Sequence, residues 1–217
     1  VVSPDALVND YGCDSLRMYE LFVGPPELDA EWDDRGIDGV NRFLKRLWNL
    51  LMDSKEADVQ PTKEMIKLRH KMVYDITNRL ESFSLNTVIS GFMEYNNKFI
   101  EMAKKEGGID KETLETIAVL LSPFAPHFAE EMWEQLGHGE TIFKAGWPSY
   151  DESAMKDDEI EVPVQINGKT RAVISISADA SKDEAIAAGK EAVADKLTGT
   201  IVKEIYVPKK IINIVQK

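Results

Sequence analysis

The sequence predicts a mainly α-helical protein, with a helical bundle followed by a small α+β domain of element order ββαββ. Apolar residues recur at three- and four-residue spacing through most of residues 1–137, which is typical of helices packed in a bundle. After a connector over 138–158, apolar and polar residues alternate, which is typical of strands. The charge changes at the same place, because residues 158–217 carry nine Lys/Arg and nine Asp/Glu, so the net charge of −12 belongs to residues 1–157.

Capping residues delimit the first two helices. Ser3 and Pro4 suit the N-cap and first position of a helix, and Gly12 suits its end. Asp14 is predicted to cap the second helix, which ends at Gly24.

Five more helices are predicted before the connector. An acidic loop over residues 25–36, anchored by Trp32, leads to the third helix, whose apolar stripe begins at Ile37. Capping residues, glycines and prolines set the other boundaries, at Thr62, Gly107, Asp110, Pro126 and Gly137. Trp147, in the connector, is expected to be pinned to the bundle.

Two hairpins and one helix are predicted in the small domain. The alternation over residues 162–166 predicts a strand, and Asn167-Gly168 predicts a type I′ hairpin turn, because both central residues of that turn need positive φ. A capping box from Ser181 to Glu184 opens a helix expected to reach Leu197. The last two strands are predicted at 201–207 and 211–215.

Composition excludes several classes of protein. A hydrophobic fraction of 43% and a charged fraction of 29% are ordinary for a globular domain, and no apolar run approaches the roughly 20 residues that span a bilayer. Cys13 is the single cysteine and no secretory signal opens the sequence, so a cytoplasmic location is expected. The opening residues 1–4 are expected to be internal to a longer chain. The negative charge argues against a general nucleic-acid binder.

Catalytic and metal-binding chemistry is not predicted. The glycines form neither a phosphate-binding loop nor a dinucleotide fingerprint, and one cysteine with three scattered histidines cannot form a zinc site. His127 could act as a base, but a partly buried helix-start histidine with one hydrogen bond is the favoured interpretation. Neighbouring carboxylates such as Glu130-Glu131 do not face one another on a helix and favour solvated surface.

Rows of basic side chains remain as candidates for a binding surface. For a single row, a solvated face is the plainer interpretation. Two rows on consecutive helices of an acidic bundle favour local attraction of a polyanion. The candidate residues are Arg42, Lys45 and Arg46 on the third helix, Lys63, Lys67 and Lys71 on the fourth, and Lys169, Arg171, Lys203, Lys209, Lys210 and Lys217 in the small domain.

Several motifs resemble a known family. DYGCDSLR at 10–17, followed by LFVGPP at 21–26, resembles the segment after the Lys-Met-Ser-Lys-Ser loop of class I aminoacyl-tRNA synthetases for branched aliphatic amino acids. PFAPHFAEEMW at 123–133 is similar to the last helices of their anticodon-binding domain. VQINGK at 164–169, with the terminal strands, resembles the small carboxy-terminal domain of bacterial-type leucyl-tRNA synthetases, whose members commonly carry a glycine where Lys209-Lys210 stands.

The resemblance implies a domain organisation and a function. Residues 1–36 would join an absent catalytic core, 37–157 would form the anticodon-binding-type bundle, and 158–217 would form the small tRNA-binding domain. The whole enzyme would be a leucine–tRNA ligase using ATP with Mg, whereas this chain would be non-catalytic, would carry no cofactor and would hold tRNA(Leu) by its inner side, elbow and variable arm. Its other partners would be the upstream catalytic and editing domains of the same monomeric chain, with no membrane.

Two alternatives stay open at this point. The chain could be the equivalent portion of a valyl-, isoleucyl- or methionyl-tRNA synthetase, which share the first motif. It could also be an acidic helical module that binds another protein and no RNA, which the net charge favours.

Overall fold

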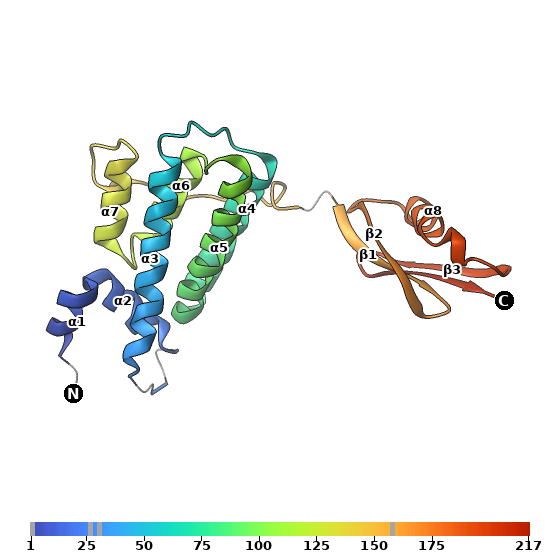
Figure 1. Ribbon diagram of the computed structural model, residues 1–217, viewed down its shortest axis with the longest axis horizontal. Helices are drawn as coiled ribbons and strands as arrows, with labels where there is room; N and C mark the ends of the chain where they lie inside the picture. Colours follow the sequence, from blue (N-terminus) through green and yellow to red (C-terminus); the bar gives the residue numbers. More distant parts are fainter. Residues whose placement is uncertain (1–2, 26–27, 30–31, 157–158) are drawn as a thin grey trace. The chain divides into compact units, whose positions relative to one another are not determined.

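The computed structural model describes residues 3–25, 28–29, 32–156 and 159–217. The chain forms two compact units, Val1–Met155 and Lys156–Lys217. Over the described residues, the first unit is helical and the second combines a four-stranded sheet with one α-helix (Figure 1). The predicted fold class, a helical bundle followed by a ββαββ domain, is therefore confirmed.

Two helices of the first unit begin at their predicted capping residues. Thr62 Oγ1 accepts a hydrogen bond from the Met65 N–H at 3.2 Å, and Asp110 Oδ1 accepts one from the Thr113 N–H at 3.0 Å. Gly12, between the first two helices, has a φ of +85°, a conformation that favours glycine. The helices are α1 (Pro4–Tyr11), α2 (Cys13–Phe22), α3 (Asp34–Ser54), α4 (Lys63–Glu81), α5 (Leu85–Glu106), α6 (Lys111–Leu121) and α7 (Pro126–Gln135).

Two predictions about helix starts are wrong. Asp14 does not cap α2, because Gly12 occupies the N-cap position and Asp14 lies in the first turn. Its carboxylate instead accepts the Phe128 N–H of α7 at 2.7 Å. Helix α3 begins at Asp34, before the predicted apolar stripe, because the Asp33 carboxylate caps it by accepting the Arg35 N–H.

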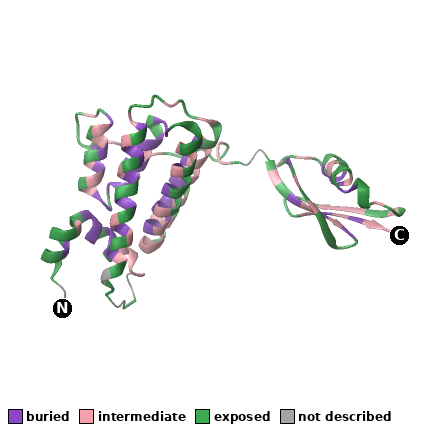
Figure 2. Ribbon diagram, viewed as in Figure 1, coloured by how far each residue is buried: buried purple, intermediate pink, exposed green. Residues whose placement is uncertain are grey.

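One continuous core holds the first unit together. Its fully buried side chains include Met18, Ile37, Ile76, Phe99 and Leu120, one from each of five helices. Figure 2 marks the buried residues of the helices in purple, next to exposed residues in green. Burial of each such side chain stabilises the folded state by about 1.5–3 kcal/mol.

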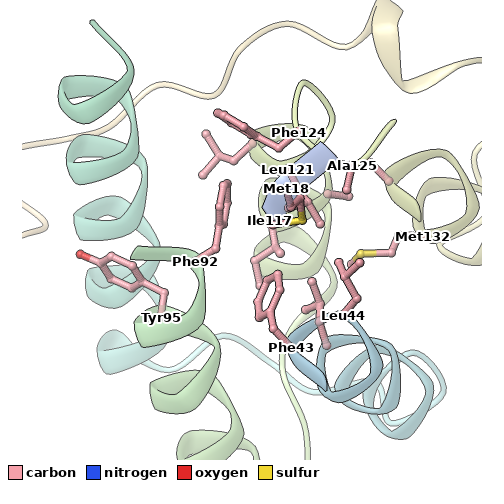
Figure 3. Close-up of a cluster of buried hydrophobic side chains, with 14 of the residues drawn as sticks. Met18, Phe43, Leu44, Phe92, Tyr95, Ile117, Leu121, Phe124, Ala125 and Met132 are labelled. Atoms are coloured by element: carbon pink, nitrogen blue, oxygen red, sulfur yellow. The ribbon is translucent and has the colours of Figure 1, made fainter. Parts of the chain in front are cut away.

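Figure 3 shows where five helices meet within that core. Phe92 of α5 lies edge-to-face against Phe124, with ring centroids 5.7 Å apart. The other labelled side chains come from α2, α3, α5, α6 and α7 and the turn before α7, and are Met18, Phe43, Leu44, Tyr95, Ile117, Leu121, Ala125 and Met132. Because this packing buries the apolar face of each helix, it determines which face of the helix is exposed and carries the polar side chains.

The second unit is a sheet of strand order β2-β1-β4-β3 with α8 (Lys182–Ala192) packed on it. Strand β1 is antiparallel to β2 and parallel to β4, and β3 and β4 are antiparallel. Asn167 and Gly168 have φ of +48° and +80°, which confirms the predicted hairpin. The capping box at Ser181 is also confirmed. The strands are β1 (Glu159–Ile166), β2 (Lys169–Ser177), β3 (Ile201–Val207) and β4 (Ile211–Gln216).

The predicted length of the last helix is wrong. Helix α8 ends at Ala192 rather than at Leu197, and a short 3₁₀ helix, Ala194–Lys196, follows. Val193 leaves helical geometry with a φ of −122° and is completely buried against the sheet. The buried position of this side chain stops the helix before the glycine that the sequence indicated. Gly199 instead lets the backbone pass close to the carbonyl of Lys217, where a Cβ atom would not fit.

Candidate nucleic-acid interface

An exposed row of cations runs along α3. The apolar stripe of this helix points into the core, so Arg42, Lys45 and Arg46 fall on the opposite face, and all three are exposed. Arg42 Nε donates to the carbonyl oxygen of Asp38 at 3.3 Å. Within the described part of the chain, none of the three forms an ion pair with a carboxylate. We call Arg42, Lys45 and Arg46 the α3 ridge.

A groove lies on each side of the α3 ridge. One, of about 590 Å³, is formed by α2, α3 and α7, and Lys45 lies on its edge. The other, of about 450 Å³, is formed by α3 and α5, where Arg46 and Lys104 both line it. Lys104 was not among the predicted residues, because its position in the sequence gives no sign that the end of α5 lies beside α3. A ligand on the ridge could therefore contact Lys45 in one groove and Arg46 and Lys104 in the other.

The predicted lysine row on α4 lies in a different setting. Lys63 is exposed, whereas Lys67 and Lys71 are half-buried. Each of the three already takes part in an interaction within the chain. The α4 row is therefore less available to a polyanion than the α3 ridge.

The connector after α7 packs against the face of α4 that carries Lys67. Trp147 Nε1 donates to Thr77 Oγ1 at 3.0 Å, which confirms that this tryptophan is pinned to the bundle. The Asp151 N–H donates to His70 Nδ1 at 3.1 Å. Tyr74 lies edge-to-face against Tyr150, with centroids 5.1 Å apart. His70, Tyr74 and Thr77 are spaced by four and three residues and so share one helix face with Lys67.

The sheet of the second unit divides the predicted cations between its two ends. All six are exposed. Because β1 and β4 are parallel, the β1–β2 turn lies at the same end of the sheet as the carboxyl end of β4, where Lys169, Lys203 and Lys217 are found. Lys209 and Lys210 lie in the β3–β4 turn at the other end, a strand length of roughly 17 Å away at about 3.4 Å per residue. Arg171 lies on β2 beside the bulge.

The histidines and carboxylates of the first unit mostly serve structural contacts. His127 Nδ1 lies 2.9 Å from Asp14 Oδ1, which is the single predicted hydrogen bond. The prediction that His127 is partly buried is wrong, because 77% of its side chain is exposed. His138 pairs with Glu115 at 2.7 Å and stacks on Trp133.

Four described groups with a shifted pKa, namely Asp33, Tyr95, Asp151 and Glu184, lie outside both grooves. Burial raises the pKa of the Tyr95 hydroxyl above its ordinary value, and the hydrogen bond from this hydroxyl to Asp75 raises it further. Three exposed carboxyls have a lowered pKa because neighbours donate hydrogen bonds to them, namely Asp33 from Arg35, Asp151 from Ser153 and Glu184 from Ser181. Each of these pKa shifts is caused by burial or by a neighbouring hydrogen-bond donor or acceptor. The shifts therefore do not indicate a catalytic acid–base pair.

The described residues lack the features of a metal site and of a membrane-spanning helix. They contain no group of three or more His, Cys, Asp or Glu side chains placed to hold a metal ion. Among the helices of the same residues, none has the length and apolar character needed to cross a membrane.

Comparison with known proteins first defines the class. Residues 62–186, more than half of the chain, match the family described as the anticodon-binding domain of tRNA ligase. The chain therefore belongs to this family. The fold agrees, because the match covers the bundle from the start of α4 and continues into the second unit.

Whole-chain comparison then finds relatives that share one amino acid specificity. The chain is 45% identical to the leucine–tRNA ligase of Fervidobacterium nodosum over 100% of its own length and 29% of that protein. It is 42% identical to the leucine–tRNA ligase of Phocaeicola vulgatus, over 99% of its own length and 23% of that protein. The chain thus spans under a third of the length of these curated relatives, which are ligases named for leucine.

A solved structure of a leucyl-tRNA synthetase is also similar to this chain in three dimensions. The crystal structure of the ternary complex of Agrobacterium radiobacter K84 agnB2 LeuRS with tRNA and LeuAMS has a TM-score of 0.80 and 25% sequence identity to this chain. The similarity covers 100% of this chain and 30% of that one. The resemblance inferred from the sequence motifs is therefore confirmed, and a module that only binds proteins is not favoured.

Proposed function

We propose that the chain is the tRNA-binding carboxy-terminal portion of a leucyl-tRNA synthetase and positions tRNA(Leu) for leucylation by a catalytic domain elsewhere in the same enzyme. In this proposal, residues 1–36 join the bundle to that domain, 37–157 form the anticodon-binding-type bundle, and 158–217 form a second tRNA contact. ATP with Mg and the editing reaction belong to the upstream domains of this cytoplasmic, monomeric enzyme. This chain contributes binding and not chemistry.

The α3 ridge is the single observation that most supports the proposal. Three exposed cations, which form no ion pair with a carboxylate among the described residues, lie together on a unit that carries the whole net charge of −12. A polyanion is attracted at such a ridge and repelled by the surrounding acidic surface, so the charge pattern orients the ligand. The A-form helices of tRNA expose phosphates and 2′-hydroxyls, which suit recognition by shape and charge.

The second unit supplies further candidate contacts. Lys169, Lys203 and Lys217 at one end of the sheet, and Lys209 and Lys210 at the other, are proposed to meet different stretches of RNA backbone. Holding the RNA at several points matters for the distant reaction, because misplacement of the acceptor end by about 1 Å costs on the order of 100-fold in rate.

A salt titration of the 217-residue chain with tRNA(Leu) tests the proposal. Each phosphate contact contributes about 0.9 to the slope of log affinity against log salt. The triple variant Arg42→Gln/Lys45→Gln/Arg46→Gln should therefore flatten the slope by between two and three. If the ridge makes three contacts, the wild-type chain should lose about 40-fold more affinity than the variant between roughly 50 and 200 mM salt.

A matched variant separates this effect from a change in net charge. Lys105→Gln/Lys156→Gln/Lys182→Gln removes three positive charges at exposed positions that are not part of the α3 ridge. For this control, the slope of log affinity against log salt should differ from the wild-type slope by less than one. Absence of tRNA binding by the wild-type chain at low salt, or equal slopes for the two triple variants, would contradict the proposal.

A further inference from the structure

We infer that the groove between α2, α3 and α7 binds one ribonucleotide of the RNA, with the phosphate at Lys45, the 2′-hydroxyl at His127 Nε2, and the sugar and base against Trp48. This inference rests on the proposed RNA-binding function and assigns a specific contact to it. All three side chains line the same groove, whose volume of about 590 Å³ falls within the range of small-molecule sites, about 300–1,000 Å³.

Aromatic and aliphatic side chains form the walls of the groove. Leu44, Trp48 and Phe128 line it together with Tyr11. Trp48 and Phe128 pack edge-to-face with centroids 5.8 Å apart, so the indole is held in place while remaining partly exposed. Unstacked RNA bases commonly rest on such aromatic surfaces.

The acidic groups of the groove already have hydrogen-bond donors. Asp14 accepts from the Phe128 N–H at 2.7 Å and pairs with His127 at 2.9 Å. Glu131 accepts from Gln135 Nε2 at 2.9 Å. Lys45, by contrast, forms no ion pair among the described residues, and Lys45 also belongs to the α3 ridge. RNA backbone that follows the ridge would thus bring a phosphate to the edge of the groove.

His127 is oriented so that one ring nitrogen is available. The Asp14 side chain is 10% exposed and holds Nδ1, whereas the histidine side chain is 77% exposed. In a neutral imidazole whose Nδ1–H donates to a carboxylate, Nε2 carries no proton and is a hydrogen-bond acceptor. A ribose 2′-hydroxyl is a donor that matches it, and this hydroxyl distinguishes RNA from DNA. Asp14 is therefore a positioning residue for this contact.

Two measurements on the 217-residue chain test the inference. The first follows the imidazole NMR signals of the three histidines during titration with tRNA(Leu), with His127→Gln used to assign one set. The His127 signals should shift. The second compares affinities: Lys45→Gln and His127→Gln should each weaken binding about 2- to 10-fold, the size expected for one contact, whereas the exposed Lys105→Gln should leave it within about 2-fold.

Modified RNA isolates the hydroxyl contact. Transcripts with 2′-fluoro in place of the 2′-hydroxyl keep an RNA-like sugar conformation but cannot donate a hydrogen bond. They should bind the wild-type chain more weakly than unmodified RNA, and this difference should shrink in His127→Gln.

The outcomes separate this inference from the proposed function. If tRNA binds but the His127 signals do not move and His127→Gln binds like wild type, the groove contact is overturned while the α3 ridge remains. If wild-type chain binds no RNA at low salt, both are overturned.

Discussion

Asp14 shows how a single side chain connects two helices that are far apart in the sequence. It lies in the first turn of α2, yet it caps α7 through the Phe128 N–H and holds His127 in one orientation. The sequence suggested a cap for the nearer helix, because capping signals are read from local spacing. A partner more than a hundred residues away has no such signal.

The Asp14 contact leads to a stability prediction. Asp14→Ala should lower the free energy of unfolding by about 1–2 kcal/mol, because the first turn of α7 loses the carboxylate that accepts its Phe128 N–H. Denaturant-induced unfolding followed by circular dichroism measures this value. Asp10→Ala, at an exposed position on α1, is the control and should change it by less than about 0.5 kcal/mol. Equal stability of the two variants would mean that Asp14 does not act as the cap.

Lys209 is a residue whose backbone departs from its usual preference. Its φ of +59° lies in the left-handed region, where a glycine would fit without strain. The turn between β3 and β4 could be predicted from Pro208-Lys209-Lys210. Which residue takes the positive φ could not, because the pairing register of the two strands decides it.

At the scale of elements, most helices and strands could be predicted because their signals are local. Thr62, Asp110, Ser181 and the Asn167-Gly168 turn act within three residues of their partners. The end of α8 could not be predicted, since Val193 is drawn into the core by the sheet rather than by its neighbours in sequence.

In the candidate site, too, the features set by local spacing could be predicted and those set by tertiary contacts could not. Helical periodicity was sufficient to place Arg42, Lys45 and Arg46 on one exposed face. Periodicity alone could not show that α4 receives the connector on the side of its lysines, nor that Lys104 of α5 lies beside Arg46. These are tertiary contacts between distant segments, and sequence spacing carries no information about them.

The two basic rows should therefore differ in their effect on RNA binding. Lys63→Gln/Lys67→Gln/Lys71→Gln should flatten the salt slope for tRNA(Leu) by less than one, because these lysines already interact within the chain. The α3 triple variant should flatten it by between two and three. Filter-binding titrations at several salt concentrations measure both slopes. A larger effect from the α4 variant would reverse the order of importance given to the two helices.

At the scale of the whole molecule, charge is separated between the two units. The first unit carries the entire net charge of −12, and the formal charge of the second unit is zero. An acidic protein that binds RNA needs its cations gathered where the RNA lies, and in the proposed function the α3 ridge is that place. The chain covers 29% and 23% of the two leucine–tRNA ligases compared with it above, so it corresponds to a part of each of them.

The most direct test uses the intact leucyl-tRNA synthetase of which this chain is proposed to be the carboxy-terminal portion. Arg42→Gln/Lys45→Gln/Arg46→Gln should lower kcat/KM for leucylation of tRNA(Leu) by at least about 10-fold, the effect of roughly 1.4 kcal/mol of lost transition-state stabilisation. Leucine-dependent ATP–pyrophosphate exchange, which needs no tRNA, should keep its wild-type rate. Unchanged leucylation, or an equal loss of both activities, would contradict the account that the ridge holds the RNA.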